Sequence, residues 1–168
     1  LRGITVGSVI TPDFVRVNAA ANRVYALGGN GTPGSNGRRV TYSVDAGNLQ
    51  QRTTLAFSGN IHHIAIDTEA NRVYGAGTHP LAQTHEFAAW DLNDNKLIAL
   101  PLTARTTGIA YNPQTQHVFL AHAGTNTAEN FVQILDVTTF GEVGRIALNA
   151  PGVMARLGNL IYVAGTDD

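Results

Sequence analysis

The residues with the clearest capacity for chemistry are the six histidines of the chain. His62 and His63 precede one short apolar segment and His122 ends another, so these three could supply imidazole nitrogens to a divalent metal. Carboxylate ligands for such a metal would come from acidic residues in nearby loops, namely Glu86, Glu129 and Asp167. No spacing matches a compact motif such as His-x-x-x-His, so the alternative stays open that these histidines only form hydrogen bonds.

The other reactive side chains do not identify a catalytic residue. The chain has no cysteine, which excludes disulfide frameworks, thiolate metal sites and cysteine nucleophiles. It also lacks a Gly-x-Ser-x-Gly elbow, the turn that presents a serine nucleophile in many hydrolases. The glycine-rich stretch 28–37 is followed by a β segment at 39–44 rather than by a helix, so it does not predict a phosphate loop.

A tandem repeat defines the elements that must position these side chains. The tetrapeptide Asn22-Arg23-Val24-Tyr25 returns at Asn71, and more loosely at Gln116 and Asn159, at steps of 49, 45 and 43 residues. Three aspartates that each end an apolar segment follow nearly the same period, at steps of 46 and 45: Asp45, Asp91 and Asp136. Such a period, with several short β segments in each unit, is typical of the blades of a β-propeller.

Each repeat unit divides into four short β segments, named a to d from the propeller axis outward. The chain is therefore expected to be all-β, a β-propeller of four-stranded antiparallel blades that is incomplete over this length. The expected units are an outer strand at 1–10, blades at 11–57, 58–102 and 103–148, and a partial blade at 149–168. Because closed propellers contain about 4 to 8 blades, the remaining blades or a second copy of the chain should cover the open ends. A small stand-alone β fold is the alternative.

Strand direction alternates within a blade, so the b–c loops share one face of the disc and the a–b turns share the other. Five of the six histidines fall on the b–c loop face, and only His117 falls on the turn face. The a segments line the axis, where Arg16, Arg105 and His63 are predicted to hold an anionic ligand. The alternative for both arginines is an ordinary ion pair or a solvent-facing position.

Net charge and hydropathy narrow the classes of partner. The formal charge is -1 and only 14% of the residues are charged, so the chain offers no electrostatic footprint for nucleic acid or anionic lipid. No apolar run approaches the roughly 20 residues that span a bilayer. We therefore expect neither a nucleic-acid partner nor a membrane span, but a protein or small-molecule ligand.

The repeat resembles the YVTN-type β-propeller repeat over nearly the whole chain. The resemblance is carried by the three c-segment aspartates and by Val24-Tyr25, Val73-Tyr74, Tyr162-Val163, Pro151-Gly152-Val153 and Thr107-Gly108-Ile109. The Thr-Asn pair that follows Tyr-Val in that repeat is missing, because Ala164-Gly165 stands in its place. Relatives of this type include cell-surface proteins, lactonase-like enzymes and periplasmic quinoprotein-like proteins. The resemblance thus implies an extracytoplasmic setting but carries over no catalytic residue.

Two functions remain open at this point. The first is a binding scaffold that recognises its partner through the b–c loops 28–37, 78–86 and 123–130, since these differ most between units and no catalytic spacing is present. The second is a lactonase-like or quinoprotein-like enzyme with a metal or cofactor over the propeller channel. Metal bound at His62, His63 or His122 would favour the enzyme, and no cofactor other than such a divalent metal is predicted.

Overall fold

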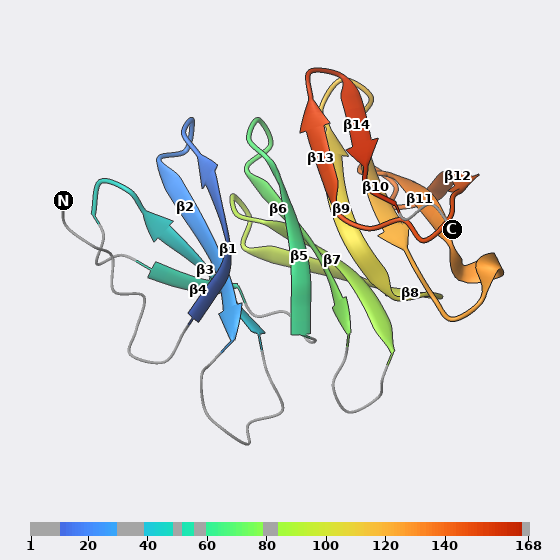
Figure 1. Cartoon of the computed structure of the whole chain (residues 1–168). Coiled ribbons are helices and arrows are strands. Elements are labelled where there is room, and N and C mark those ends of the chain that lie inside the picture. Colours follow the sequence, from blue (N-terminus) through green and yellow to red (C-terminus); the bar gives the residue numbers. More distant parts are fainter. Residues whose placement is uncertain (1–10, 30–38, 49–51, 56–59, 79–83, 166–168) are drawn as a thin grey trace.

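The computed structural model describes residues 11–29, 39–48, 52–55, 60–78 and 84–165. Within these ranges the chain forms fourteen β-strands and one 3₁₀ turn at Thr127–Glu129. Three four-stranded antiparallel sheets and one two-stranded hairpin stand side by side in chain order (Figure 1). The prediction of an all-β fold with four-stranded antiparallel blades is confirmed, whereas the outer strand predicted for 1–10 lies outside the described residues. No helix in the described part of the chain could cross a membrane.

Each four-stranded sheet is a meander in which consecutive strands pair. The first sheet contains β1 (Thr11–Asn18), β2 (Arg23–Gly29), β3 (Arg39–Asp45) and β4 (Arg52–Leu55). The second contains β5 (Asn60–Asp67), β6 (Arg72–Thr78), β7 (His85–Asp91) and β8 (Lys96–Leu102). The third contains β9 (Thr106–Asn112), β10 (His117–His122), β11 (Phe131–Asp136) and β12 (Glu142–Ala147). The hairpin contains β13 (Met154–Leu157) and β14 (Leu160–Val163).

The first turn of each four-stranded sheet combines a buried polar side chain with a residue of left-handed backbone. The buried side chains accept hydrogen bonds from backbone amides two or three residues ahead, and they are Asn18, Asp67 and Asn112. Four residues further on, the backbone φ angles are 51°, 54° and 57° at Asn22, Asn71 and Gln116. Asparagine tolerates this conformation better than most side chains. The repeated Asx-x-x-x-Asn pattern is therefore a device that reverses the chain.

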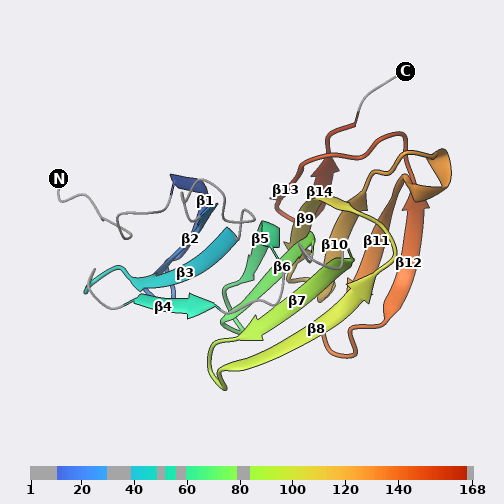
Figure 2. The ribbon, with the colours of Figure 1, turned by 90° about the horizontal axis from the view of Figure 1, so that it is seen from below.

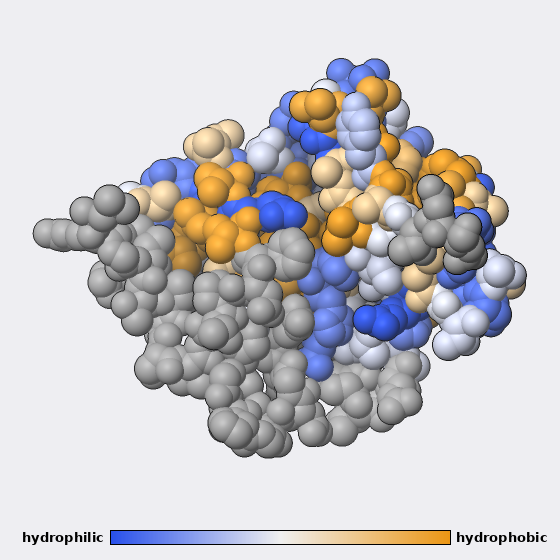
Figure 3. Space-filling view, in the orientation of Figure 1, coloured by the Kyte–Doolittle hydropathy of each residue, from blue (hydrophilic) through white to orange (hydrophobic). Residues whose placement is uncertain are grey.

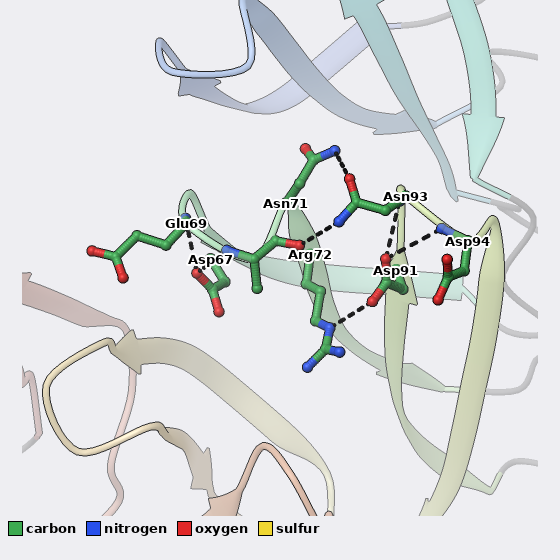
Figure 4. A network of polar contacts seen from close by, with 8 residues as sticks. Asp67, Glu69, Asn71, Arg72, Asp91, Asn93 and Asp94 are labelled. Carbon is green, nitrogen blue, oxygen red and sulfur yellow. Dashed lines mark hydrogen bonds and ion pairs between the residues drawn. The ribbon is translucent and has the colours of Figure 1, made fainter.

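The periodic aspartates of the c segments build the turn between the third and fourth strands. In the second sheet, the Asp91 Oδ1 atom accepts hydrogen bonds from the backbone amides of Asn93, at 3.0 Å, and Asp94, at 3.4 Å. The Asp91 Oδ2 atom accepts a hydrogen bond of 2.8 Å from Arg72 Nε on the neighbouring strand (Figure 4). The corresponding turns of the other two sheets use Asp45 and Asp136 in the same way. These aspartates repeat because the turns repeat.

The hydrophobic core lies between neighbouring sheets. Tyr25 of the first sheet packs in one cluster with Ile64 and Trp90 of the second. Tyr74 of the second sheet packs in another cluster with Leu120 of the third. The second sheet is therefore covered on both faces. Figure 2 shows the resulting arc, with β4, β8 and β12 along its outer side.

The fourth unit has a shorter turn than the others. Leu157 and Leu160 pair directly, so only two residues join β13 to β14, and Gly158 has a φ of 62°. The strand β13 lies beside β9 and extends the row formed by β1, β5 and β9 (Figure 1). These four strands correspond to the a segments of the repeat and are called the inner strands below.

Candidate functional site

Among the described residues, a groove runs along the inner strands and offers a place for a ligand. Its cavity of about 310 Å³ is bounded by residues from β1, β5, β9 and β13. This volume is at the lower end of the range for small-molecule pockets, roughly 300 to 1,000 Å³. Most of the lining residues are apolar, and the polar ones are Arg16, Thr68, Tyr111 and Arg156. We call this feature the axial groove.

Two arginines give the axial groove its charge. Arg16 projects from β1 and Arg156 from β13, and both side chains are exposed. Each guanidinium donates one hydrogen bond to a nearby backbone carbonyl, Arg16 to Val15 at 3.1 Å and Arg156 to Gly158 at 2.9 Å. The groove therefore carries two guanidinium groups on its wall.

Tyr111 also lines the groove, but its hydroxyl oxygen is buried from solvent. Burial, together with the nearby Asp67 carboxylate, raises the pKa of the Tyr111 phenol above its ordinary value. The hydroxyl therefore stays protonated at neutral pH. Its ring packs against Tyr74 of the second sheet, so Tyr111 contributes to the core between the sheets.

The structure brings only part of the predicted anion site together. Arg16 lines the axial groove, and Arg16 and His63 also border a smaller adjoining hollow of about 30 Å³. Arg105 lies just before β9 and is exposed, but it lines neither cavity. Its backbone carbonyl accepts a hydrogen bond of 3.3 Å from the amide of Ala123. Arg156, which sequence reasoning missed, lies on the groove wall opposite the first sheet.

His62 and His63 lie at an irregularity of the innermost strand of the second sheet. The pairing of β5 with β6 shifts between Ile61 and His63, so His62 occupies a β-bulge. The same shift occurs in β1 between Pro12 and Phe14. Bulges recur where a strand must bend or a side chain must be redirected. The two imidazole rings have their centroids 6.5 Å apart.

His122 is fully buried inside the third sheet, and its environment occupies both ring nitrogens. Its Nδ1 atom lies 3.1 Å from the carbonyl oxygen of Ala104, and its Nε2 atom lies 3.1 Å from Oε1 of Gln133. The Gln133 amide in turn donates a 2.6 Å hydrogen bond to Glu142. Burial lowers the pKa of His122, against the opposing effect of the hydrogen bonds with Gln133 and the backbone. Burial therefore favours the neutral imidazole, which can donate a hydrogen bond to only one of these two oxygens, that of Ala104 or that of Gln133.

The predicted metal site stays a prediction. Among the described residues, no group of three His, Cys, Asp or Glu side chains is placed to hold a metal ion. Glu129 instead holds its own loop, because its carboxylate accepts hydrogen bonds from the Thr125 amide and from the Asn126 side chain, at 3.2 and 2.6 Å. The other two carboxylates proposed as metal ligands are Glu86 and Asp167, and Asp167 lies outside the described residues.

The loops predicted to bind a partner can be followed only in part. Residues 30–38 and 79–83, in the first two b–c loops, lie outside the described residues. The third loop contains the 3₁₀ turn Thr127–Glu129 and is closed by a hydrogen bond of 3.1 Å from the Gly124 amide to the Asn130 side chain. On the opposite face, the a–b and c–d turns use Asp67, Asp91 and their neighbours for hydrogen bonds within the turns (Figure 4).

Comparison with known proteins shows the fold and no closer relationship. No model of a known protein family matches the chain, and no curated protein matches its sequence. Among solved structures, it is similar to Kuenenia stuttgartiensis hydrazine synthase, with 14% identity, a TM-score of 0.67, and coverage of 88% of this chain and 39% of that chain. It is also similar to the β-propeller domain of the Trilobed protease from Pyrococcus furiosus, with 10% identity, a TM-score of 0.64, and coverage of 86% and 45%.

A third similar structure is acylaminoacyl peptidase in complex with Z-Gly-Gly-Phe-chloromethyl ketone. Its identity is 10% and its TM-score 0.70, and the match covers 94% of this chain and 28% of that chain. The present chain thus spans less than half the length of each of these three proteins. At such low identity the similarity establishes the fold alone, and the YVTN repeat type remains a resemblance. The described sheets are blades of a β-propeller.

Proposed function

We propose that this chain is a ligand-binding segment of a β-propeller, and that its axial groove binds a small anionic molecule through Arg16 and Arg156. The observation that carries the proposal is the presence of two guanidinium groups, those of Arg16 and Arg156, on the wall of one cavity. Guanidinium groups form paired hydrogen bonds with carboxylates and phosphates, which favours anions of either kind. The apolar remainder of the wall favours a ligand with a short hydrocarbon portion.

The size and composition of the groove restrict the class of ligand further. A cavity of about 310 Å³ suits a small molecule. Because Arg16 and Arg156 project from the first and last inner strands, a ligand with an anionic group at each end would engage both. Succinate, a short dicarboxylate, is the probe that we choose for such a ligand. The b–c loops remain the proposed surface for a protein partner, in the extracytoplasmic setting that the repeat resemblance implies.

Isothermal titration calorimetry of the chain with succinate, inorganic phosphate and the neutral analogue succinamide tests the proposal. We expect succinate or phosphate to bind and succinamide not to bind, and the preferred anion distinguishes a carboxylate site from a phosphate site. Replacing Arg156 by glutamine should weaken anion binding about tenfold, since a hydrogen bond to a charged group contributes about 1.5 kcal/mol or more. Arg105→Gln is the matched control, because it removes the same charge outside the groove.

Two results would refute this assignment. Equal losses in Arg105→Gln and Arg156→Gln would mean that the anion responds only to net charge. Equal binding of succinate and succinamide would mean that the arginines do not recognise the ligand. Metal analysis of the same protein distinguishes the binding function from the enzyme alternative. One tightly held metal ion per chain, lost in the His62→Ala and His63→Ala variants, would support a metal-dependent activity instead.

A further inference from the structure

The same contact joins the first sheet to the second and the second to the third. In each case, the third residue of the b strand is a tyrosine that faces the next sheet, and both tyrosines, Tyr25 and Tyr74, are fully buried. Tyr25 packs in one cluster with Ile64 of β5. Tyr74 packs with Ile109 and Tyr111 of β9, and the ring centroids of the two tyrosines lie 5.2 Å apart.

The inner strand that packs against each tyrosine also follows a repeated pattern, and we call it the receiving half of the contact. Two of its apolar side chains pack in the same cluster as the tyrosine. They lie three residues and one residue before the polar residue that ends the strand. In β5 these are Ile64 and Ile66, before Asp67; in β9 they are Ile109 and Tyr111, before Asn112. The contact therefore has two complementary halves, a b-strand tyrosine and an a-strand apolar pair.

Among the described residues, each end of the arc presents one of these halves with no matching half packed on it. Val15 and Val17 of β1 stand three residues and one residue before Asn18, and they are 50% and 62% exposed. Tyr162 is the third residue of β14 and is 52% exposed. By strand alternation, Leu157 and Leu160 lie on the same face as Tyr162, and both are exposed. One end thus carries the receiving half and the other carries the tyrosine half.

The distribution of exposed apolar side chains supports this assignment. Among the described residues, none of the exposed large hydrophobic side chains belongs to the second sheet, which has neighbours on both faces. They lie either on β1 or from β12 onward: Val15, Val17, Val143, Ile146, Leu148, Val153, Leu157, Leu160 and Tyr162. Figure 3 shows hydrophobic surface over β1 and at the β13–β14 hairpin. Contiguous apolar surface of this kind marks an interaction site.

We propose that two copies of this chain associate head to tail, so that the β14 face with Tyr162 of one copy packs on the β1 face with Val15 and Val17 of the other. The contact would reuse the geometry that the chain already forms twice internally. Two arcs would supply roughly seven blades, within the range of closed propellers. The inference concerns the ends of the arc and is independent of the anion proposed for the axial groove.

Sedimentation velocity of the intact chain over a range of concentrations tests the proposal. Wild-type protein should form a dimer at high micromolar concentration. Val15→Asp should stay monomeric because its β1 face is lost, and Tyr162→Asp should stay monomeric because its β14 face is lost. Both side chains are exposed, so circular dichroism should show unchanged folding. Gln114→Asp, an exposed change in an a–b turn, adds the same charge and should dimerise like the wild type.

A mixture of the two monomeric variants gives the decisive result. The Val15→Asp copy retains an intact β14 face and the Tyr162→Asp copy retains an intact β1 face, so the mixture should form a heterodimer with one contact. A mixture that stays monomeric while the wild type dimerises would overturn the head-to-tail geometry. A wild-type chain that is monomeric at every concentration, or that forms larger aggregates insensitive to both substitutions, would overturn association between copies.

Discussion

Replacing Asp91 by alanine removes three hydrogen bonds from the turn that joins β7 to β8. The Arg72 bond is the shortest, with 2.8 Å between Nε and Oδ2, and the Asp91 side chain is only 17% exposed. Burial opposes ionisation of the Asp91 carboxyl, but the hydrogen bonds from Arg72 and from the amides of Asn93 and Asp94 outweigh it and lower its pKa. The folded protein therefore stabilises the ionised form.

The expected cost follows from these contacts. A hydrogen bond to a charged group contributes about 1.5 to 3 kcal/mol to stability, and a turn or cap acceptor contributes about 1 kcal/mol. Arg72 is partly exposed and the Asp94 bond is long, at 3.4 Å, which reduces the sum. We expect Asp91→Ala to lower the free energy of unfolding by about 2 to 4 kcal/mol at pH 7. Asp91→Asn keeps the acceptor for the turn and should cost about 1 kcal/mol less.

The pH dependence of the effect has a definite sign. Because the pKa of Asp91 is lower in the folded state, its contribution is complete above the unfolded value of about 4 and is lost as the pH falls through the folded value. Urea denaturation of the wild type and Asp91→Ala should thus show a large gap at pH 7 and a smaller gap at pH 3. Asp94→Ala, an exposed aspartate of the same turn, is the control and should cost less than about 0.5 kcal/mol. Equal effects of the two substitutions, or a gap that does not change with pH, would refute the reasoning.

Three further predictions concern the packing and the buried histidine. Gly77→Ala should lose about 1 to 3 kcal/mol because the new methyl group overlaps the Asn60 carbonyl, whereas Gly144→Ala has room and should be nearly neutral, as measured by urea midpoints. The pKa of His122 is lowered by burial, so wild-type stability should fall as the pH drops below about 6.5, and His122→Gln should remove that pH-dependent step in a urea series. Leu120→Ala should cost about 2 to 5 kcal/mol in calorimetry because Leu120 is fully buried between the second and third sheets.

Each of these three predictions has a distinct contrary result. Similar urea midpoints for the Gly77 and Gly144 variants would mean that β5 and β6 do not approach as closely as described. A stability profile that keeps its slope between pH 7.5 and 5.5 after His122→Gln would place the responsible titration elsewhere. A cost near zero for Leu120→Ala would show that the two sheets do not share a core.

The repeat predicted the fold well because the residues that recur in each unit form hydrogen bonds within local turns. Asn22 and Asn71 mark left-handed turn residues, and Asp91 and its counterparts mark turn acceptors, so the pattern can be read without knowing any distant contact. Hydrophobic alternation then places the strands of each sheet. What the pattern could not supply is the surroundings of His122, whose partners Gln133 and Ala104 come from other segments.

The axial groove was predictable only in part, for a related reason. Arg16 was found because it lies within a well-marked a segment, and the structure places it on the groove wall. Arg156 was not predicted, although it lies in the inner strand β13, which continues to Leu157. The two-residue turn at Gly158 lacks the Asx signal that ends the other inner strands. Arg105 precedes a strand of the right type but lies outside the part that borders the cavity.

The most direct test of the proposed binding function is a titration of isotope-labelled protein with succinate, followed by NMR chemical shifts of backbone amides and arginine Nε groups. The proposal predicts shift changes confined to the inner strands β1, β5, β9 and β13 and to the Nε groups of Arg16 and Arg156, which Arg156→Gln abolishes and Arg105→Gln leaves intact. Shift changes confined to the b–c loops, or changes at Arg105 with none at Arg16 and Arg156, would contradict it.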